Sequence, residues 1–332
     1  MRSKADTHVH TYFSGTTRYK ALKFPESVTT PKEQVDRAIR NGYSVICITD
    51  HNTIKGGVNA KKYGSSLDSI DVVVGEEIDS REGEIIGLWL NEEIPRGLSI
   101  EETLDLIRSQ GGVAIAPHPF SFYVHCLGER IFDLDIDGIE VLNGGHPDGY
   151  TNSRAQMVCE DNPGRWAEIS ASDAHSTYTA GYAWTEFEGS GEDDLRKAIL
   201  SRSTVPVGRP APVFTQVQWS IEVVSKARKM IGKSLVNRLP EDPDNPIVTK
   251  IHSISSGKKI AGFVGGLIYI TPPFPFIGTM LSTTWLKRRA QTLTYEFETK
   301  FRRNSSKRIN EFEYCGTDSG CPKTLKKGEP KK

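Results

Sequence analysis

Short apolar runs alternate with amphipathic stretches from residue 5 to about residue 210. A first strand carries the sequence ADTHVH, and further strands are expected at Val45–Thr49, Ile70–Val74, Ile85–Leu90, Val113–Ala116, Gly138–Leu142 and Ala167–Ala171. Short apolar strands that alternate with helices favour parallel pairing of the strands. The pattern therefore predicts an α/β fold built from β/α units.

Three of the amphipathic stretches have clear helix boundaries. PKEQVDRAIRNG begins with Pro31 and ends near Gly42. In SIEETLDLIRSQGG, Ser99 and Glu102 form a capping box and Gly111 ends the helix. GEDDLRKAILS has acidic residues at the positive end of its helix.

A proline-rich segment, residues 205–212, ends this alternation and divides the chain into two unlike parts. The overall charge is balanced, but residues 213–332 hold 21 Lys and Arg against 10 Asp and Glu. The first part is correspondingly acidic and holds all the histidines except His252. We therefore expect one domain at residues 1–212 and a basic extension at residues 213–332.

The cysteines and the N-terminus indicate a reducing compartment. Cys47, Cys126 and Cys159 are scattered, and Cys315 and Cys321 are expected to be free thiols in the C-terminal tail. No apolar signal-peptide core fits before the first strand. The expected location is the cytoplasm. Association with a membrane through the C-terminal segment is a further hypothesis.

Polar groups rich in His and carboxylates follow the expected strands. They are His8 with His10, the run TDHN at 49–52, GEEI at 75–78 with Glu84, PHP at 117–119, and SDAH at 172–175. The ends of β/α strands are where such folds place their ligand sites. Because mixed sets of His, Asp and Glu suit ions such as Zn, Mn or Fe, these groups predict a metal site.

The pair His8 and His10 illustrates the geometry that a metal requires. Residues at i and i+2 of a strand point to the same face, so both imidazoles are expected to be aimed at one spot. Neutral imidazole is the commonest protein ligand of zinc-like metals.

Seven motifs in order make the chain resemble the PHP (polymerase and histidinol phosphatase) superfamily of metal-dependent phosphoesterases. The motifs are DxHxH at 6–10, TDHN at 49–52, GEEI at 75–78, EGEIIGL at 82–88, HPF at 118–120, GIEVxN at 138–143 and SDAH at 172–175. The resemblance covers roughly residues 5–205. It implies a distorted β/α barrel of seven strands, with the metals at the C-terminal ends of the strands.

The resemblance also implies a ligand set. His8, His10, Glu77 and Asp173 would hold one metal, with Glu77 bridging to a second. The second metal and any third would be completed by His51, His118 and His175, and Glu84 stands where some relatives have a histidine. Of the adjacent pair, Glu77 matches the family ligand better than Glu76. Asp6 and Asp50 are expected to orient the imidazoles.

The loop after His10 departs from the pattern of many relatives, which carry an aspartate four to six residues after the second histidine. Here that stretch reads SGTT at 14–17, and no acid occurs before Glu26. We therefore expect two divalent ions, or two with a weak third, of Zn, Mn or Fe, with Mg as a further candidate.

The activity implied by the resemblance is hydrolysis of a phosphoester by metal-activated water, with Glu77, Asp173 and His175 in the catalytic centre. The substrate classes in the family are small phosphomonoesters, nucleotides and the ends of nucleic acids, and the resemblance does not choose among them. Arg130 and Arg154 are candidate phosphate-binding residues, because a guanidinium fork suits phosphate.

Two other functions stay open on the sequence. One is C–N hydrolysis by an amidohydrolase-like enzyme, whose barrel also opens with HxH. The other is a catalytically impaired PHP protein that acts as a membrane-associated binding module. The retained ligand positions and the final SDAH motif favour the phosphoesterase.

The extension contains residues 260–286, which carry no charge and are flanked by Lys258-Lys259 and Lys287-Arg288-Arg289. Prolines at 272, 273 and 275 divide this segment into halves too short to span a bilayer alone. A re-entrant or interfacial hairpin at an anionic lipid surface, a full span and a buried hairpin all fit the pattern. We expect the first, with residues 258–289 as the lipid contact.

Overall fold

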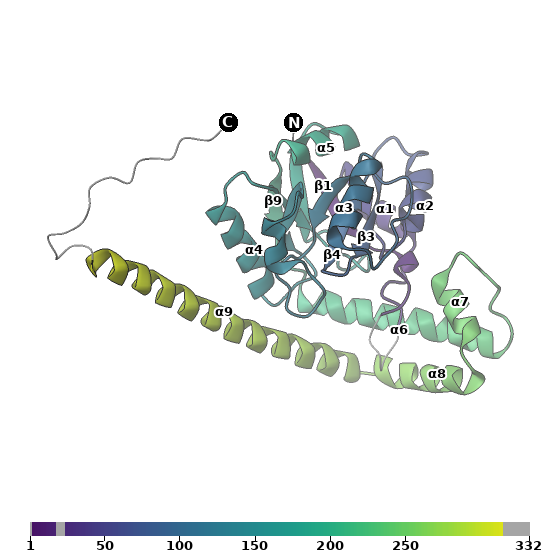
Figure 1. Cartoon of the computed structure of the whole chain (residues 1–332). Helices are drawn as coiled ribbons and strands as arrows, with labels where there is room; N and C mark the ends of the chain where they lie inside the picture. Colours follow the sequence, from purple (N-terminus) through teal and green to yellow (C-terminus); the bar gives the residue numbers. More distant parts are fainter. Residues whose placement is uncertain (1, 18–23, 315–332) are drawn as a thin grey trace. The chain divides into compact units, whose positions relative to one another are not determined.

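The computed structural model describes residues 2–17 and 24–314, and the side chains of residues 297–314 are not included in the description (Figure 1). By contacts between residues the chain divides into one unit of Met1–Lys287 and a second unit of Arg288–Lys332. The sheet and the candidate site belong to the first unit.

Nine strands of the described residues form one sheet, in the order β7-β6-β5-β4-β3-β2-β1-β8-β9. Their bounds are β1 Arg2–Val9, β2 Val45–Ile48, β3 Asp71–Asp79, β4 Glu84–Leu88, β5 Val113–Ala116, β6 Gly138–Asn143, β7 Ala167–Ala171, β8 Ala183–Glu188 and β9 Val205–Gly208. All the strands expected from the apolar runs are present, whereas β8 and β9 were not predicted. Strand β9 lies in the proline-rich segment that was interpreted as the exit from the domain.

The strands pair in parallel between β1, β2 and β3 and between β5, β6 and β7. Strand β4 is antiparallel to both of its neighbours, so the expectation of parallel pairing was wrong there. The reason is the turn Ser80–Gly83, in which the Ser80 amide donates to the Gly83 carbonyl. A turn this short allows a hairpin, whereas a parallel connection needs a dozen or more residues.

The sheet curls until its two ends nearly meet. The Ser170 amide of β7 donates to Thr185 Oγ1 of β8, and Thr185 Oγ1 donates back to the Ser170 carbonyl at 2.8 Å. An isolated bridge also joins Val9 to Ala174, just after β7. The fold is therefore the distorted seven-stranded barrel expected from the resemblance, with β8 and β9 added beside β1.

Helices cover the outside of the barrel. Their bounds are α1 Pro31–Arg40, α2 Lys55–Gly64, α3 Ile100–Ser109, α4 Tyr150–Asp161 and α5 Glu192–Leu200, with short 3₁₀ turns at Tyr12–Ser14 and Gly128–Phe132. The predicted capping box of Ser99 and Glu102 is confirmed at the start of α3. Gly111, with a φ of 71°, follows the end of the same helix in the left-handed region that glycine tolerates.

Different helices lie over the two ends of the barrel. At the end where the strands begin, the backbone amide of Glu192 in α5 donates to the Asp71 carboxylate at the start of β3. At the opposite end lies α6 (Val213–Leu235), whose Trp219 indole donates to the Glu26 carbonyl at 3.0 Å. The extension therefore begins with a helix that packs over the end of the barrel where the parallel strands terminate.

Three more helices follow: α7 Pro246–Ser253, α8 Ser256–Ile270 and α9 Phe274–Tyr314. In the part of the chain that the structure describes, no single helix is long and apolar enough to cross a membrane. Only α8 taken together with residues 274–296 of α9 passes that test, as a pair bent by 82°. Cys47, Cys126 and Cys159 are free thiols, and Cys315 and Cys321 lie outside the described residues.

Candidate metal centre

All the ligand-type residues expected from the sequence lie in one cluster at the end of the barrel that α6 covers. They are His8, His10, His51, Glu77, Glu84, His118, Asp173 and His175, and each has a ligand-type atom within 3.8 Å of another member. Glu84 begins β4 opposite Asp79, the last residue of β3, so the antiparallel hairpin brings it to the same end.

Four side chains converge as the ligands of one ion would. The Nε2 atoms of His8 and His10 are 3.0 Å apart, and each is 3.3 Å from Glu77 Oε2. Asp173 Oδ1 lies 3.6 Å from His8 Nε2 and 3.4 Å from His10 Nε2. Ligands held at about 2.0–2.2 Å from a tetrahedral ion are about 3.2–3.6 Å apart, so the donor set and its spacing fit a zinc-type metal.

Glu77 joins this group to a second one. Its Oε2 atom also lies 3.0 Å from His51 Nδ1, and its Oε1 atom lies 3.2 Å from His118 Nε2. His118 Nε2 is in turn 3.7 Å from Glu84 Oε2. A carboxylate with both oxygens engaged in this way is suited to bridge two ions.

The second group has a polar atom that the protein itself does not satisfy. His118 is buried, and its Nδ1 atom has no hydrogen-bond partner among the described residues. Its backbone has a φ of 28°, in the region that disfavours residues with a Cβ atom. A buried donor or acceptor without a partner costs free energy. The atom of His118 that faces Glu77 and Glu84 is Nε2, so Nδ1 is not the candidate metal ligand of this group.

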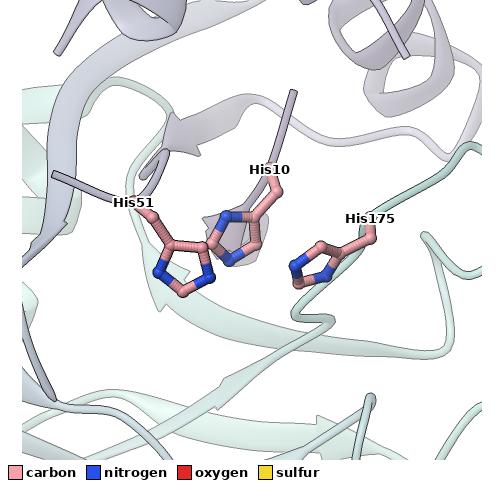
Figure 2. Close-up of side chains that lie close together, drawn as sticks. All are labelled: His10, His51 and His175. Atoms are coloured by element: carbon pink, nitrogen blue, oxygen red, sulfur yellow. The ribbon is translucent and has the colours of Figure 1, made fainter. Parts of the chain in front are cut away.

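A third group contains His10, His51 and His175, whose imidazoles gather at one place (Figure 2). The ring centroid of His10 is 4.6 Å from that of His51 and 4.1 Å from that of His175. The three histidines follow β1, β2 and β7, so the near closure of the barrel is what brings them together. The side chain of His175 is 22% exposed and that of His51 14%, so this group lies on the open side of the cluster.

Glu26 belongs to this third group, although the sequence analysis did not assign it. Its Oε2 atom lies 3.0 Å from His51 Nε2 and 3.8 Å from His175 Nε2. The loop after His10 folds back on itself through two backbone hydrogen bonds. The Thr17 amide donates to the Phe24 carbonyl, and the Glu26 amide donates to the Gly15 carbonyl. The only signal in the sequence was that Glu26 is the first acid after the HxH motif.

Further carboxylates hold the imidazoles in place. Glu140 Oε1 lies 2.8 Å from His8 Nδ1, and its Oε2 accepts the His118 amide. Asp50 accepts the Ser14 hydroxyl at 2.7 Å, and Ser14 Oγ lies 2.9 Å from His10 Nδ1. Asp50 therefore acts on His10 through Ser14. The role of Glu140, within the GIEVxN motif, was not predicted.

Asp6 is placed differently from Asp50 and Glu140. It is buried and accepts the Ser172 amide at 3.0 Å, next to Asp173 in the chain. Burial raises the pKa of Asp6 to about 7 despite hydrogen bonds from Ser172.

The imidazoles and carboxylates of the cluster shift one another's pKa values. Burial opposes the charged form of His8, yet the carboxylates of Asp173, Glu77 and Glu140 together raise its pKa well above the ordinary value. Burial also opposes ionisation of Glu77 and Asp173, but the surrounding histidines hold the pKa of each well below its usual range. For Glu26, hydrogen bonds from His175 and His51 outweigh burial and lower the pKa. The carboxylates of the cluster therefore stay ionised beside the imidazoles.

Glu76 points away from the cluster, as the alternation of a strand requires. It is buried, and its Oε2 accepts the Ile94 amide at 2.9 Å. Burial raises its pKa to about 8. The geometry agrees with the choice of Glu77 over Glu76 as the ligand.

The two candidate arginines have acidic partners outside the cluster. Arg130 pairs with Glu101 at 2.5 Å, and Arg154 pairs with Glu129 at 3.0 Å. The guanidinium of Arg154 also lies 5.2 Å from the ring centroid of Phe120. Phosphate binding by Arg130 and Arg154 stays a prediction.

His146 also lies beside the candidate ligands, although the sequence analysis did not assign it. It is buried, its ring centroid is 5.1 Å from that of His118, and His118, His146 and Asp173 form a further group with ligand spacing. Its Nδ1 atom is 3.4 Å from Asp148 Oδ2, and burial lowers its pKa.

A pocket of about 510 Å³ opens beside His51. One wall comes from the barrel, with Phe13, Lys55 and Glu93, and the other from the extension, with residues around Pro246 and Lys250 in α7. Trp219 of α6 also approaches the cluster, with its ring centroid 6.3 Å from that of His175. The extension therefore contributes to the surroundings of the candidate centre.

Comparison with known proteins agrees with this architecture. The PHP domain family matches residues 6–164, and a PHP-associated family matches residues 165–204. An uncharacterised protein of Methanocaldococcus jannaschii is 54% identical over 152 residues, which are 46% of this chain and 88% of the relative. Another from the same organism is 30% identical over 192 residues, covering 55% of this chain and 70% of the relative.

Two solved structures share the fold. One, from Bacteroides vulgatus, is a two-domain protein described as containing a predicted PHP-like metal-dependent phosphoesterase. It has a TM-score of 0.52 and 19% identity, over 63% of this chain and 65% of that one. The other is PsfC from Pseudomonas syringae, with a TM-score of 0.51 and 19% identity, over 68% of this chain and 99% of that one.

Proposed function

The chain belongs to the PHP domain family, and from this premise we propose that it is a metal-dependent phosphoesterase that hydrolyses a small phosphorylated molecule. The observation that carries the proposal is the spacing of His8, His10, Glu77 and Asp173 around one point. Glu77 connects this group to His51 and His118. These residues form two adjoining sets of ligands rather than a single isolated set.

The residues that would hold divalent ions are the eight predicted from the sequence, together with Glu26 beside His51 and His175. When bound, such ions lower the pKa of water and neutralise charge on phosphoryl oxygens. The donor set of imidazoles and carboxylates suits Zn, Mn or Fe, and Mg is the remaining candidate.

Side chains of the protein provide ionised carboxylates at this site and fix the orientation of its imidazoles. Glu77 and Asp173 are held ionised by the histidines around them. Glu140 and Asp50 fix the orientation of His8 and His10, the latter through Ser14. His8 and His10 are fully buried, so a substrate reaches the cluster from the side of His51 and His175.

The pocket beside His51 supports a substrate of small-molecule size. Its volume of about 510 Å³ is within the range of about 300–1,000 Å³ that is typical of ligand pockets. Lys55 and Lys250 offer positive charge for a phosphate, and Glu93 and Asp244 offer acceptors for hydroxyl or amino groups of the rest of the molecule. A phosphorylated metabolite or a nucleotide fits this lining better than a long nucleic acid.

The test joins metal content to activity in the full chain, because α6 and α7 border the site. The purified protein and a His8→Ala/His10→Ala variant are analysed for Zn, Mn and Fe. Both are then assayed with added Mn on phosphomonoesters, nucleotides and a 5′-phosphorylated oligonucleotide. We expect at least two ions per chain and phosphate release that the variant lacks. Metal binding without phosphate release, but with hydrolysis of an amide substrate, would instead establish the amidohydrolase-like alternative.

A further inference from the structure

A second surface, remote in sequence from the metal ligands, exposes large apolar side chains. We define the α8–α9 apolar surface by side chains that are 43–69% exposed: Ile260, Val264, Leu267, Ile268, Phe274, Phe276, Ile277, Met280, Leu281 and Trp285. All of them belong to the unit Met1–Lys287. Exposed large apolar side chains concentrated on two successive helices are typical of interaction sites rather than of ordinary solvent-facing surface.

The apolar residues of α8 form a stripe that does not face the rest of the protein. Ile260, Val264, Leu267 and Ile268 recur at the spacing of one helical face. The other side of α8 packs on α6, which lies beside it in Figure 1. There a Cβ atom at Gly262 would lie 3.4 Å from Ile231 and one at Gly266 would lie 3.3 Å from Val224. The glycines let the two helices approach closely, while the opposite stripe stays uncovered.

The charges around this surface select the kind of partner. Residues 260–286 contain no charged side chain, and cations stand at both outer ends, at Lys258, Lys259 and Lys287. The bend between the helices lies at residues 271–273, so the cations are at the ends of the pair farthest from the bend. An apolar zone bordered by lysines matches the acyl boundary and the anionic headgroups of a lipid bilayer.

We propose that α8 and the first turns of α9 dock the protein onto an anionic lipid bilayer as an interfacial hairpin. The pair lies on the membrane and does not span it, because α8 has 15 residues and is fixed to α6 along one side. This inference does not depend on the proposed phosphoesterase activity.

The experiment is co-sedimentation of the full chain with vesicles. One set is phosphatidylcholine alone, and the other contains phosphatidylcholine and phosphatidylglycerol in equal parts. A Leu267→Glu/Leu281→Glu variant places charges on the exposed surface, at positions 48% and 67% exposed. The matched control is Met157→Glu/Leu200→Glu, because these positions are 41% and 51% exposed but lie on α4 and α5.

We expect the wild type and the control to bind the anionic vesicles, with binding at least tenfold weaker for the Leu267→Glu/Leu281→Glu variant. A Lys258→Gln/Lys259→Gln/Lys287→Gln variant is expected to lose the preference for anionic over neutral vesicles. Circular dichroism of each variant verifies that the helices are retained.

Three results would overturn the proposal. One is absence of wild-type binding to either set of vesicles, and another is equal binding by the wild type and the Leu267→Glu/Leu281→Glu variant. The third is a wild-type protein that is dimeric without lipid, together with a Leu267→Glu/Leu281→Glu variant that is monomeric and a control variant that stays dimeric. A second copy of the chain would then be the occupant of the α8–α9 apolar surface.

Discussion

The Glu26 carboxylate lies 3.0 Å from the imidazole of His51, measured between Oε2 and Nε2, although the two residues belong to different loops. The same oxygen is 3.8 Å from His175 Nε2. Many relatives place an aspartate shortly after the second histidine of HxH, and this chain has none there. Glu26 brings a carboxylate to the side of the cluster where His10, His51 and His175 meet (Figure 2).

Replacement of Glu26 by Gln is expected to lower the number of bound ions without abolishing metal binding. The amide keeps the shape of the side chain but removes the negative charge that faces His51 and His175. The ligands His8, His10, Glu77 and Asp173 are unaffected, so at least one ion per chain is retained. Elemental analysis after dialysis measures the change, with Glu160→Gln as the control because Glu160 is exposed on α4. An unchanged metal content would show that Glu26 is not a ligand.

Glu77→Gln is expected to damage the centre more than Asp173→Asn. Glu77 lies within 3.3 Å of His8, His10, His51 and His118. Asp173 Oδ1 lies at the longer distances of 3.4–3.6 Å from His8, His10 and His175. We expect Asp173→Asn to lose one ion and Glu77→Gln to fall below one ion per chain. Both variants should lose about a thousandfold or more in kcat/KM, because metal stabilisation of developing charge amounts to several kcal/mol.

The comparison of metal contents decides whether Glu77 bridges two ions. Equal metal loss in the two variants would contradict a bridging role for Glu77. A Glu76→Gln variant is the matched control for metal content, since Glu76 is adjacent in the chain and points away from the cluster.

The position of most candidate ligands could be predicted from the sequence because they lie on strands or close to strand ends. His8 lies on β1 and His10 is the first residue after it, while His51, His118 and His175 lie two to four residues after β2, β5 and β7. A residue at a strand end has its position set by the sheet, and the sheet is set by the apolar runs. The α/β architecture and the gathering of polar groups at the strand ends could therefore be predicted from local patterns, whereas the seven-stranded barrel and the individual ligand assignments came from the family resemblance.

Residues placed by loops and by short turns could not be predicted in this way. Glu26 reaches His51 only because the loop after β1 pairs with itself through Thr17 and Phe24. Glu84 reaches His118 because the Ser80–Gly83 turn makes β4 antiparallel. Trp219 approaches His175 from a helix of the extension, which lies beyond the family resemblance. Each of these contacts depends on tertiary structure that no local spacing encodes.

The buried acid Glu76 predicts a decrease of stability with rising pH. Burial raises its pKa from 4.5 to about 8, so above pH 4.5 the unfolded chain loses the proton while the folded chain keeps it. The free energy of unfolding therefore falls between pH 4.5 and about 8 and levels off above this range. The loss is on the order of 5 kcal/mol, at about 1.4 kcal/mol per pKa unit.

Urea unfolding of the wild type and of Glu76→Gln, at about pH 5 and about pH 9, measures this effect. The glutamine can still accept the Ile94 amide but does not titrate in this range. We expect the decrease between the two pH values to be smaller in the variant than in the wild type, because only Asp6, whose pKa burial raises to about 7, still contributes as a buried acid of raised pKa. The same decrease in both proteins would assign the pH dependence to other groups.

Glu140→Gln is expected to weaken metal binding although Glu140 is not among the ligands. Its carboxylate holds His8 Nδ1 at 2.8 Å and so fixes the ring whose Nε2 faces the cluster. Loss of such a partner typically lowers metal affinity about 10–100-fold. Competition with a chelator measures the affinity, and Glu168→Gln on the exposed side of β7 is the control. Unchanged competition would mean that packing alone orients His8.

Lys250→Gln tests whether the extension forms part of the substrate pocket. Lys250 lies on α7 and lines the pocket that opens at His51, opposite Lys55 of α2. Because the lysine is exposed and outside the metal ligands, its charge acts on substrate binding and not on the metal content. We expect KM for a phosphorylated substrate to rise by about threefold to tenfold with kcat nearly unchanged, as for loss of a solvent-exposed charge contact worth about 1 kcal/mol.

Lys229→Gln serves as the control in the same kinetic assay, because Lys229 is an exposed lysine of α6 outside the pocket lining. The effect of Lys250→Gln should shrink as the salt concentration rises, since an exposed charge pair is screened over about 10 Å at 0.1 M salt. Identical KM values for the two variants would remove α7 from the substrate site. Substrate binding would then depend on the barrel alone, and the extension would act through α6 and the α8–α9 apolar surface.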